Sequence, residues 1–136
     1  MIIGNAIFAK LSESDQVKTI AGDRIYPIVS SDDKYPLIVY EVSRQTNEML
    51  DRPDLINYTV SITVVSQKYA TTCTLANAVI DALDRKSGTW GGIEIRKCNM
   101  TESTSEDAYS EGSNIESIFY TQDQTYSVWA YKRKES

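Results

Sequence analysis

The chain contains 136 residues, of which 41% are hydrophobic and 24% are charged. These proportions are typical of a folded domain and exclude an intrinsically disordered chain. The formal net charge of −5 and a pI near 4.7 disfavour a protein that grips a phosphate backbone, because such a protein needs a basic face. There is no run of about 18 apolar residues and no basic start typical of a signal peptide, so we expect a protein that stays in the cytosol.

The first predicted element is a short amphipathic helix. Its apolar residues recur at helical spacing: Ile3, Ala6, Ile7 and Leu11. Ser14 or Asp15 can cap a further helical turn, and Gly22 ends that turn because glycine tolerates the left-handed conformation found after helix ends. A short strand from about Arg24 to Val29 is expected next.

The next two strands are predicted to form a long hairpin. Apolar and polar side chains alternate over residues 36–44, and they alternate most clearly from Ile56 to Ser66. The segment between them, Gln45 to Leu55, contains Asn, Asp and Pro residues that break any regular pattern, so we expect an extended hairpin tip. The tip carries Met49 and Leu50, which either fold back on the sheet or contact another chain.

A second and stronger helix is predicted from Tyr69 to about Asp84. Its apolar positions follow helical spacing: Cys73, Ala76, Val79, Ile80 and Leu83. Arg85, Lys86 and Gly88 are expected to end it, because cations favour the negative end of the helix dipole and glycine provides a stop. Isoleucines then alternate with charged residues in a strand from Ile93 to about Met100.

The remaining segment is predicted to contain one long loop and one strand. Thr101–Asn114 is rich in Ser, Glu, Asp and Thr without an apolar period, so we expect a loop that is mobile or ordered only by a partner. From Gln124 to Lys132 both faces carry apolar or aromatic side chains, as in a central or interface strand. The predicted order is α-β-β-β-α-β-β. It indicates one domain over residues 1–136 of the α+β class, with two main helices on one face of an antiparallel or mixed sheet.

The sequence offers little for catalysis. There is no histidine, which removes the commonest general base and metal ligand. Two pairs of adjacent carboxylates remain: Asp32 with Asp33, and Glu106 with Asp107. Adjacent strand residues point to opposite faces, and charge runs without a supporting motif usually lie on the surface. Cys73 and Cys98 fit no metal-ligand spacing and are expected in the core. We therefore expect no enzyme, no metal and no cofactor.

Three short runs, in a fixed order, carry a resemblance to a known family. They are Gly22–Pro27 (GDRIYP), Tyr35–Tyr40 (YPLIVY), and Tyr58–Val64 leading into the second helix. In this order and at these separations they resemble the tail completion or tail terminator family of long-tailed bacteriophages and prophages, a group of small head-to-tail joining proteins. The resemblance covers about Ile3 to Asp84.

The resemblance implies a structural protein and not an enzyme. Such a protein would form a ring with copies of itself, commonly a hexamer, that caps the finished tail tube and offers a docking face to the head. Its partners would be the tail tube protein and a head-neck connector protein, with no membrane and no specific nucleic-acid binding, while DNA passes through the ring. It would assemble in the host bacterial cytoplasm and then reside in the virion at the tail-neck junction. The usual fold is an α+β sandwich, which agrees with the periodicity.

A cyclic ring interface joins two different patches of each copy. The candidate patches are the hairpin tip, Arg44 to Asp54, and the loop Thr101–Asn114. Within the tip the candidate interface residues are the following: Arg44, Met49, Leu50, Arg52 and Pro53.

Three other functions stay open at this point. One is another neck component of similar size, such as a head completion protein. The second, from a different class, is a small enzyme that uses carboxylates alone, which would need a deep pocket with converging acids. The third is a nucleic-acid binder, for which only the basic end of the chain, Lys132 to Lys134, gives any support.

Overall fold

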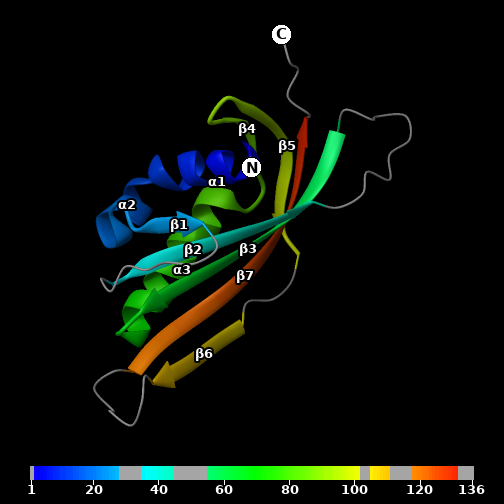
Figure 1. Cartoon of the computed structure of the whole chain (residues 1–136). Coiled ribbons are helices and arrows are strands. Elements are labelled where there is room, and N and C mark those ends of the chain that lie inside the picture. Colours follow the sequence, from blue (N-terminus) through cyan, green and yellow to red (C-terminus); the bar gives the residue numbers. More distant parts are fainter. Residues whose placement is uncertain (1, 28–34, 45–54, 102–104, 111–117, 132–136) are drawn as a thin grey trace.

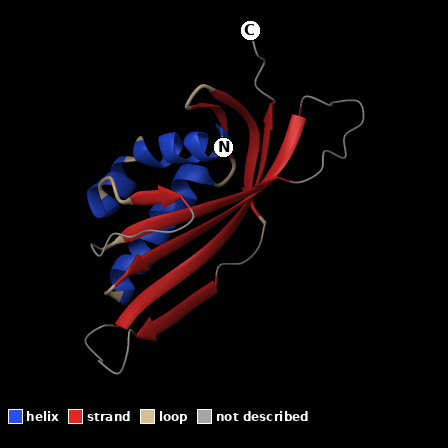
Figure 2. Cartoon of the chain, in the orientation of Figure 1, coloured by secondary structure: helices blue, strands red, loops and turns tan. Residues whose placement is uncertain are grey.

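The computed structural model describes residues 2–27, 35–44, 55–101, 105–110 and 118–131. In this part of the chain three helices cover one face of a seven-stranded, strongly twisted sheet (Figures 1 and 2). The predicted α+β class is confirmed.

Two consecutive helices begin the chain, α1 (Ile2–Ser12) and α2 (Asp15–Ala21). Ser14 caps α2, since its Oγ accepts a hydrogen bond of 3.3 Å from the Val17 backbone N–H. At the other end Gly22 has a φ of 61°, and its N–H donates to the Lys18 carbonyl. The predicted cap and stop are therefore confirmed, and the further turn is a separate helix.

Most of the predicted elements lie close to where the sequence places them. The long helix α3 spans Tyr69–Leu83. The strands are β1 (Ile25–Pro27), β2 (Leu37–Arg44), β3 (Leu55–Ser66), β4 (Lys86–Trp90), β5 (Ile93–Met100), β6 (Ser105–Ser110) and β7 (Ile118–Tyr131). Their order in the sheet is β1-β2-β3-β7-β5-β4, with β6 attached to β7. Only the pair of β1 and β2 is parallel, so the described sheet is mixed.

β7 is the central strand, as its two apolar faces predict. On one side it pairs with β3 along the whole of that strand, from Leu55 opposite Tyr131 to Ser66 opposite Tyr120. On the other side it pairs with β5 in its second half and with β6 in its first half. The strand begins at Ile118 and not at Gln124, because six further residues are held by β6.

The second helix ends within one residue of the predicted Asp84, but Lys86 and Gly88 do not have the helix-ending roles expected of them. Helix α3 ends at Leu83, Asp84 already has extended dihedrals, and Arg85 turns the chain with a φ of 60°. The Arg85 N–H then donates to the Cys98 carbonyl at 2.7 Å, so pairing with β5 begins at once. Lys86 and Gly88 therefore lie in strand β4 and do not belong to the helix end.

The predicted loop Thr101–Asn114 contains a strand, so this expectation was also wrong. β6 pairs with β7 from Ser105 opposite Asp123 to Ser110 opposite Ile118. Among the described residues β6 has a single neighbouring strand, and Glu106, Asp107 and Ala108 are all exposed. The three exposed residues in its middle give no apolar alternation, which explains why the sequence pattern missed this edge strand.

The core lies between the helices and the covered face of the sheet. Its largest fully buried side chains include Ile3, Ile7, Leu11, Ile38, Ile62, Leu75, Leu83, Ile95 and Tyr126. Cys98 is buried there, as predicted, whereas Cys73 is only half-buried. A smaller cluster of Leu37, Val65 and Phe119 lies apart from this core.

Gly91 should be required at the turn between β4 and β5. Its φ is 57°, and a Cβ atom there would lie 3.2 Å from the Ala9 Cβ and 3.3 Å from the Asn5 carbonyl oxygen of α1. We expect Gly91→Ala to lower the free energy of unfolding by more than the roughly 1–2 kcal/mol that left-handed backbone costs an L-residue. Urea denaturation measures this.

Gly92→Ala is the matched control. Gly92 also has a positive φ, of 84°, but a Cβ atom there meets nothing within 4 Å. Equal losses of stability in the two variants would contradict a role for the contact with α1.

Candidate assembly surface

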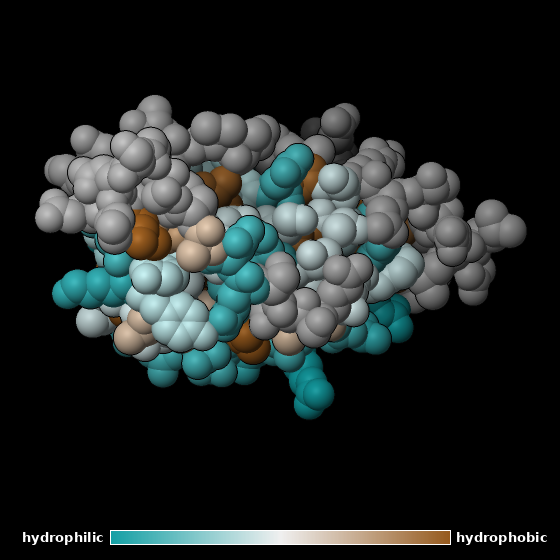
Figure 3. Space-filling model, turned by 90° about the horizontal axis from the view of Figure 1, so that it is seen from below, coloured by the Kyte–Doolittle hydropathy of each residue, from teal (hydrophilic) through white to brown (hydrophobic). Residues whose placement is uncertain are grey.

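The helices leave one face of the sheet uncovered, and many of its side chains carry hydroxyl or amide groups. Thr63 faces Asp123 across β3 and β7, and its hydroxyl donates to the carboxylate at 2.6 Å. Asn57 Nδ2 donates to Ser127 Oγ at 2.8 Å in the same ladder. Seen from below, the described apolar residues show only as small separate spots among polar ones (Figure 3). The two polar pairs satisfy each other, and Asn57 is buried, so hydrogen bonds between β3 and β7 hold this part of the face together.

A groove of about 540 Å³ lies between α2 and α3. Its walls include two carboxylates, Asp15 and Asp81, beside Gln16 and Asn77. The groove is open to solvent, whereas an active site excludes water to strengthen its electrostatics. Among the described residues no group of three or more Cys, Asp or Glu side chains could hold a metal ion. The groove therefore offers no recognisable catalytic arrangement.

The carboxylate pairs considered from the sequence do not form a catalytic dyad in the described structure. Asp32 and Asp33 lie outside the described residues. Glu106 and Asp107 follow each other on β6, so their side chains leave opposite faces of the strand.

The predicted hairpin is confirmed, but most of its tip lies outside the described residues. Arg44 is the last residue of β2 and pairs with Tyr58 of β3. The other four candidate interface residues, Met49, Leu50, Arg52 and Pro53, are not described. Because Leu55 at the start of β3 pairs with Tyr131 at the end of β7, the tip connects to the sheet at the end where β7 finishes.

A chain of polar side chains crosses the covered face of the sheet at the opposite end. The buried Tyr126 hydroxyl donates to Gln124 Oε1 at 2.6 Å. Gln124 Nε2 donates to the Ala76 carbonyl of α3 at 3.0 Å and to Gln122 Oε1 at 3.1 Å. Gln122 Nε2 then donates to Glu106 Oε1 at 3.3 Å. Every buried side-chain nitrogen and oxygen of this network has a hydrogen-bond partner, which is the condition for a polar network to stabilise a core.

The last side chain of this hydrogen-bonded network is Glu106, which fixes the edge strand β6. Glu106 Oε2 also accepts a bond of 2.7 Å from the hydroxyl of Tyr69, the first residue of α3. That hydrogen bond is the main cause that raises the pKa of Tyr69 above its usual value. The pKa of Tyr126 is also raised, but here the main cause is burial. Both tyrosines therefore remain neutral donors at physiological pH, and the Glu106 carboxylate is tied to both α3 and β7.

Sequence reasoning missed this network, although a signal was present. Gln122 and Gln124 continue the alternation of Tyr126, Val128 and Ala130, so all five belong to the covered face. Two glutamines on a buried face require polar partners, and the described structure supplies them from α3 and β6.

These observations describe an α+β protein with free strand edges and with no recognisable catalytic arrangement among the described residues. The model of the family described as tail completion protein gp17 matches residues 5–113, and the chain belongs to this family. It is a structural protein of the phage tail and not an enzyme, as the resemblance implied. The match extends the resemblance beyond Asp84.

A solved structure supports the same fold. One chain from the structure entitled "Virion of native gene transfer agent (GTA) particle" superposes with a TM-score of 0.66 at 13% identity. The alignment covers 95% of this chain and 94% of that one. No curated protein matches the sequence at a significant level. Within the described residues, no helix is both long enough and apolar enough to cross a membrane.

The polar network should be strongly non-additive. Gln124→Leu leaves the buried Tyr126 hydroxyl and the Gln122 amide without their partner, so we expect a loss of about 1–3 kcal/mol in the free energy of unfolding. Adding Tyr126→Phe removes the hydroxyl that has lost its acceptor, so the double variant should be no less stable than Gln124→Leu alone. A double-mutant cycle by urea denaturation measures the coupling, and simple additivity would contradict the network.

The two thiols should differ sharply in reactivity. Burial, with a smaller effect of Asp84, raises the pKa of Cys98 from 9.0 to about 12, so at pH 8 we expect iodoacetamide to modify half-buried Cys73 first and Cys98 only in denaturant. Because the unfolded thiol ionises first, this group also lowers stability as pH rises from about 9 towards 12. Mass spectrometry of wild type and Cys73→Ser tests this, and native-state labelling of Cys98 would refute it.

Proposed function

We propose that this protein is the tail terminator of a long-tailed phage or phage-like particle: several copies form a ring that caps the finished tail tube and offers a docking face to the head. The observation that carries this proposal is the family match over residues 5–113, whose description assigns a role in completing the tail. Its partners are then copies of itself, the tail tube protein and a head-neck connector. The ring has six copies, as is usual in the family that the sequence resembles.

The composition fits a ring through which DNA passes. A net charge of −5 gives the chain little tendency to hold phosphates, whereas a cationic lumen would bind DNA by releasing its counterions. DNA then slides through the ring without a specific protein-DNA contact.

The long hairpin between β2 and β3 is proposed as one part of the ring interface. Arg44 ends the described part of β2, and the tip then adds the two apolar side chains Met49 and Leu50 with Arg52 and Pro53. A hairpin that extends beyond its sheet can reach a neighbouring copy, where apolar residues and arginine commonly anchor interfaces.

Tail binding separates the terminator from its nearest rival, a head completion protein. If the proposal holds, lysates of a phage that lacks this gene contain unjoined heads and tails, to which the purified protein can be added. We expect the protein to cosediment with purified tail tubes, to decorate one tube end in electron micrographs, and to restore head-tail joining. Cosedimentation with DNA-filled heads and not with tubes would favour the head completion role instead.

Changing the hairpin tip should abolish self-association without unfolding the protein. In the double variant Met49→Ser, Leu50→Ser the proposed apolar anchors are lost, so light scattering should give the mass of a monomer under conditions where wild type is oligomeric. The melting temperature should be nearly unchanged, because the core of the described residues is filled without these two side chains. Phe8→Ser is the matched control, since Phe8 is an exposed apolar residue on α1. An oligomer of unaltered mass in the double variant would exclude the tip from the interface.

A further inference from the structure

The charges of the second half of the chain are segregated along the sequence. Residues 85–97 contain four cations, Arg85, Lys86, Arg96 and Lys97, against the single carboxylate Glu94. Residues 98–131 contain no lysine or arginine at all. They carry six carboxylates: Glu102, Glu106, Asp107, Glu111, Glu116 and Asp123. Such long stretches of one sign are not required by the fold, because surface charges of both signs are normally interspersed.

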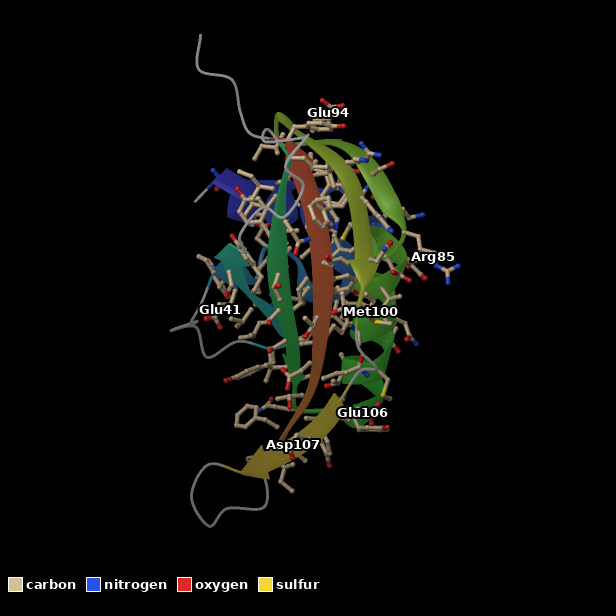
Figure 4. The ribbon with its side chains drawn as sticks, turned by 90° about the vertical axis from the view of Figure 1, so that its right-hand side faces the viewer. Glu41, Arg85, Glu94, Met100, Glu106 and Asp107 are labelled. Atoms are coloured by element: carbon tan, nitrogen blue, oxygen red, sulfur yellow. The ribbon has the colours of Figure 1, made fainter. Side chains whose placement is uncertain are left out.

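The fold places the basic group on the hairpin of β4 and β5. All four cations are exposed, and the side chain of Arg85 is 89% exposed. Its φ of 60° directs the chain out of α3, and Figure 4 shows Arg85 extending away from the ribbon. The only ion pair of this group among the described residues is a weak one of 4.0 Å between Arg85 and Asp84. The hairpin therefore presents nearly uncompensated positive charge.

The fold places Glu106 and Asp107 on β6, at the other end of the sheet (Figures 1 and 4). Both residues are exposed and neither forms an ion pair within the described residues. Glu106 is held by Tyr69 and Gln122, so its position is fixed before any partner binds. A carboxylate has about four lone-pair sites, which leaves Glu106 free to accept further bonds from a cation.

Both charged groups lie at strands whose outer edge is free in the described structure. β4 pairs only with β5, and β6 pairs only with β7, among the described residues. Free edges carry backbone N–H and C=O groups that can pair with another chain. Like charges across two strands are unfavourable, so β4 against β4 and β6 against β6 are both disfavoured, whereas β4 against β6 is favoured. The charges therefore select a contact between two different edges.

We propose that the β4 edge of one copy docks against the β6 edge of the next, with Arg85 and Lys86 facing Glu106 and Asp107. This inference rests on the proposed ring, for which it supplies the contact that sets the order of copies. The contact is heterologous when each copy meets one neighbour through its β4 edge and another through its β6 edge, and repeated heterologous contacts close into a ring when the rotation between copies allows it. In the proposed ring, the charges orient neighbouring copies, and Met49 and Leu50 of the β2–β3 hairpin add apolar contacts.

Charge reversal tests the contact directly. The variant Arg85→Glu, Lys86→Glu and the variant Glu106→Lys, Asp107→Lys should each self-associate at least about tenfold more weakly than wild type in sedimentation velocity. Asp107→Lys alone should weaken association in the same direction and leaves the hydrogen bonds of Glu106 intact. Lys18→Glu and Asp81→Lys, on exposed positions of α2 and α3, are the matched controls and should associate as wild type does.

Mixing the two reversed variants gives the sharpest result. In an equimolar mixture each contact again joins opposite charges, so we expect oligomers of wild-type mass, and recovery also shows that both variants are folded. Raising the salt concentration should weaken association of wild type. The measurement is made on free protein and on protein bound to tail tubes, so that assembly on the tube is also detected.

The outcomes separate this contact from the proposed function. If wild type forms rings but the reversed variants do so equally well, or their mixture does not recover, the contact is wrong and the tail terminator role stands. If wild type forms only pairs, the head-to-tail arrangement is wrong, since a two-fold axis would satisfy both edges in a dimer. If wild type associates neither alone nor on tubes, both the contact and the ring are refuted.

Discussion

The pairing of β7 on both of its sides is the constraint on which the rest of the structure depends. One strand of 14 residues carries β3 along one side, and β5 and β6 along the other. The hairpin of β2 and β3, the basic hairpin of β4 and β5, and the acidic strand β6 are thus all attached, directly or through one strand, to the same backbone. The surfaces that we propose as contacts are thereby held at fixed positions relative to one another, as interfaces between repeated copies require.

Elements that bury one regular face could be predicted from the sequence. Helix α3 begins at Tyr69 as expected, because its apolar residues keep helical spacing over many positions. Strand β3 begins within one residue of the predicted Ile56, because its apolar and polar residues alternate over many positions. The end of α2 at Gly22 could also be predicted, because the positive φ that follows a helix end is a local requirement that glycine meets. In these segments the tertiary contacts favour the same structure as the local sequence pattern.

Elements that depend on a partner could not be predicted in this way. β4 and β6 have little or no buried face of their own, and they are strands because β5 and β7 satisfy their backbone groups. Glu106 illustrates the same limit for the site: its sequence neighbours suggest solvated charge, yet its two oxygens accept from Tyr69 and Gln122. Tyr69 lies 37 residues away, so no local pattern could reveal this contact.

A net charge describes this molecule poorly, because its sum hides two opposed groups. The value of −5 disfavours a protein that grips DNA, but it also conceals four cations on one hairpin and a run of 34 residues without any. For an enzyme, the decisive residues converge on one pocket. For a protein that acts by associating, they lie on separate edges, because each copy must present both halves of the contact. The proposed function therefore depends on how charges are distributed over the free edges of the fold, and not on any single cluster of side chains.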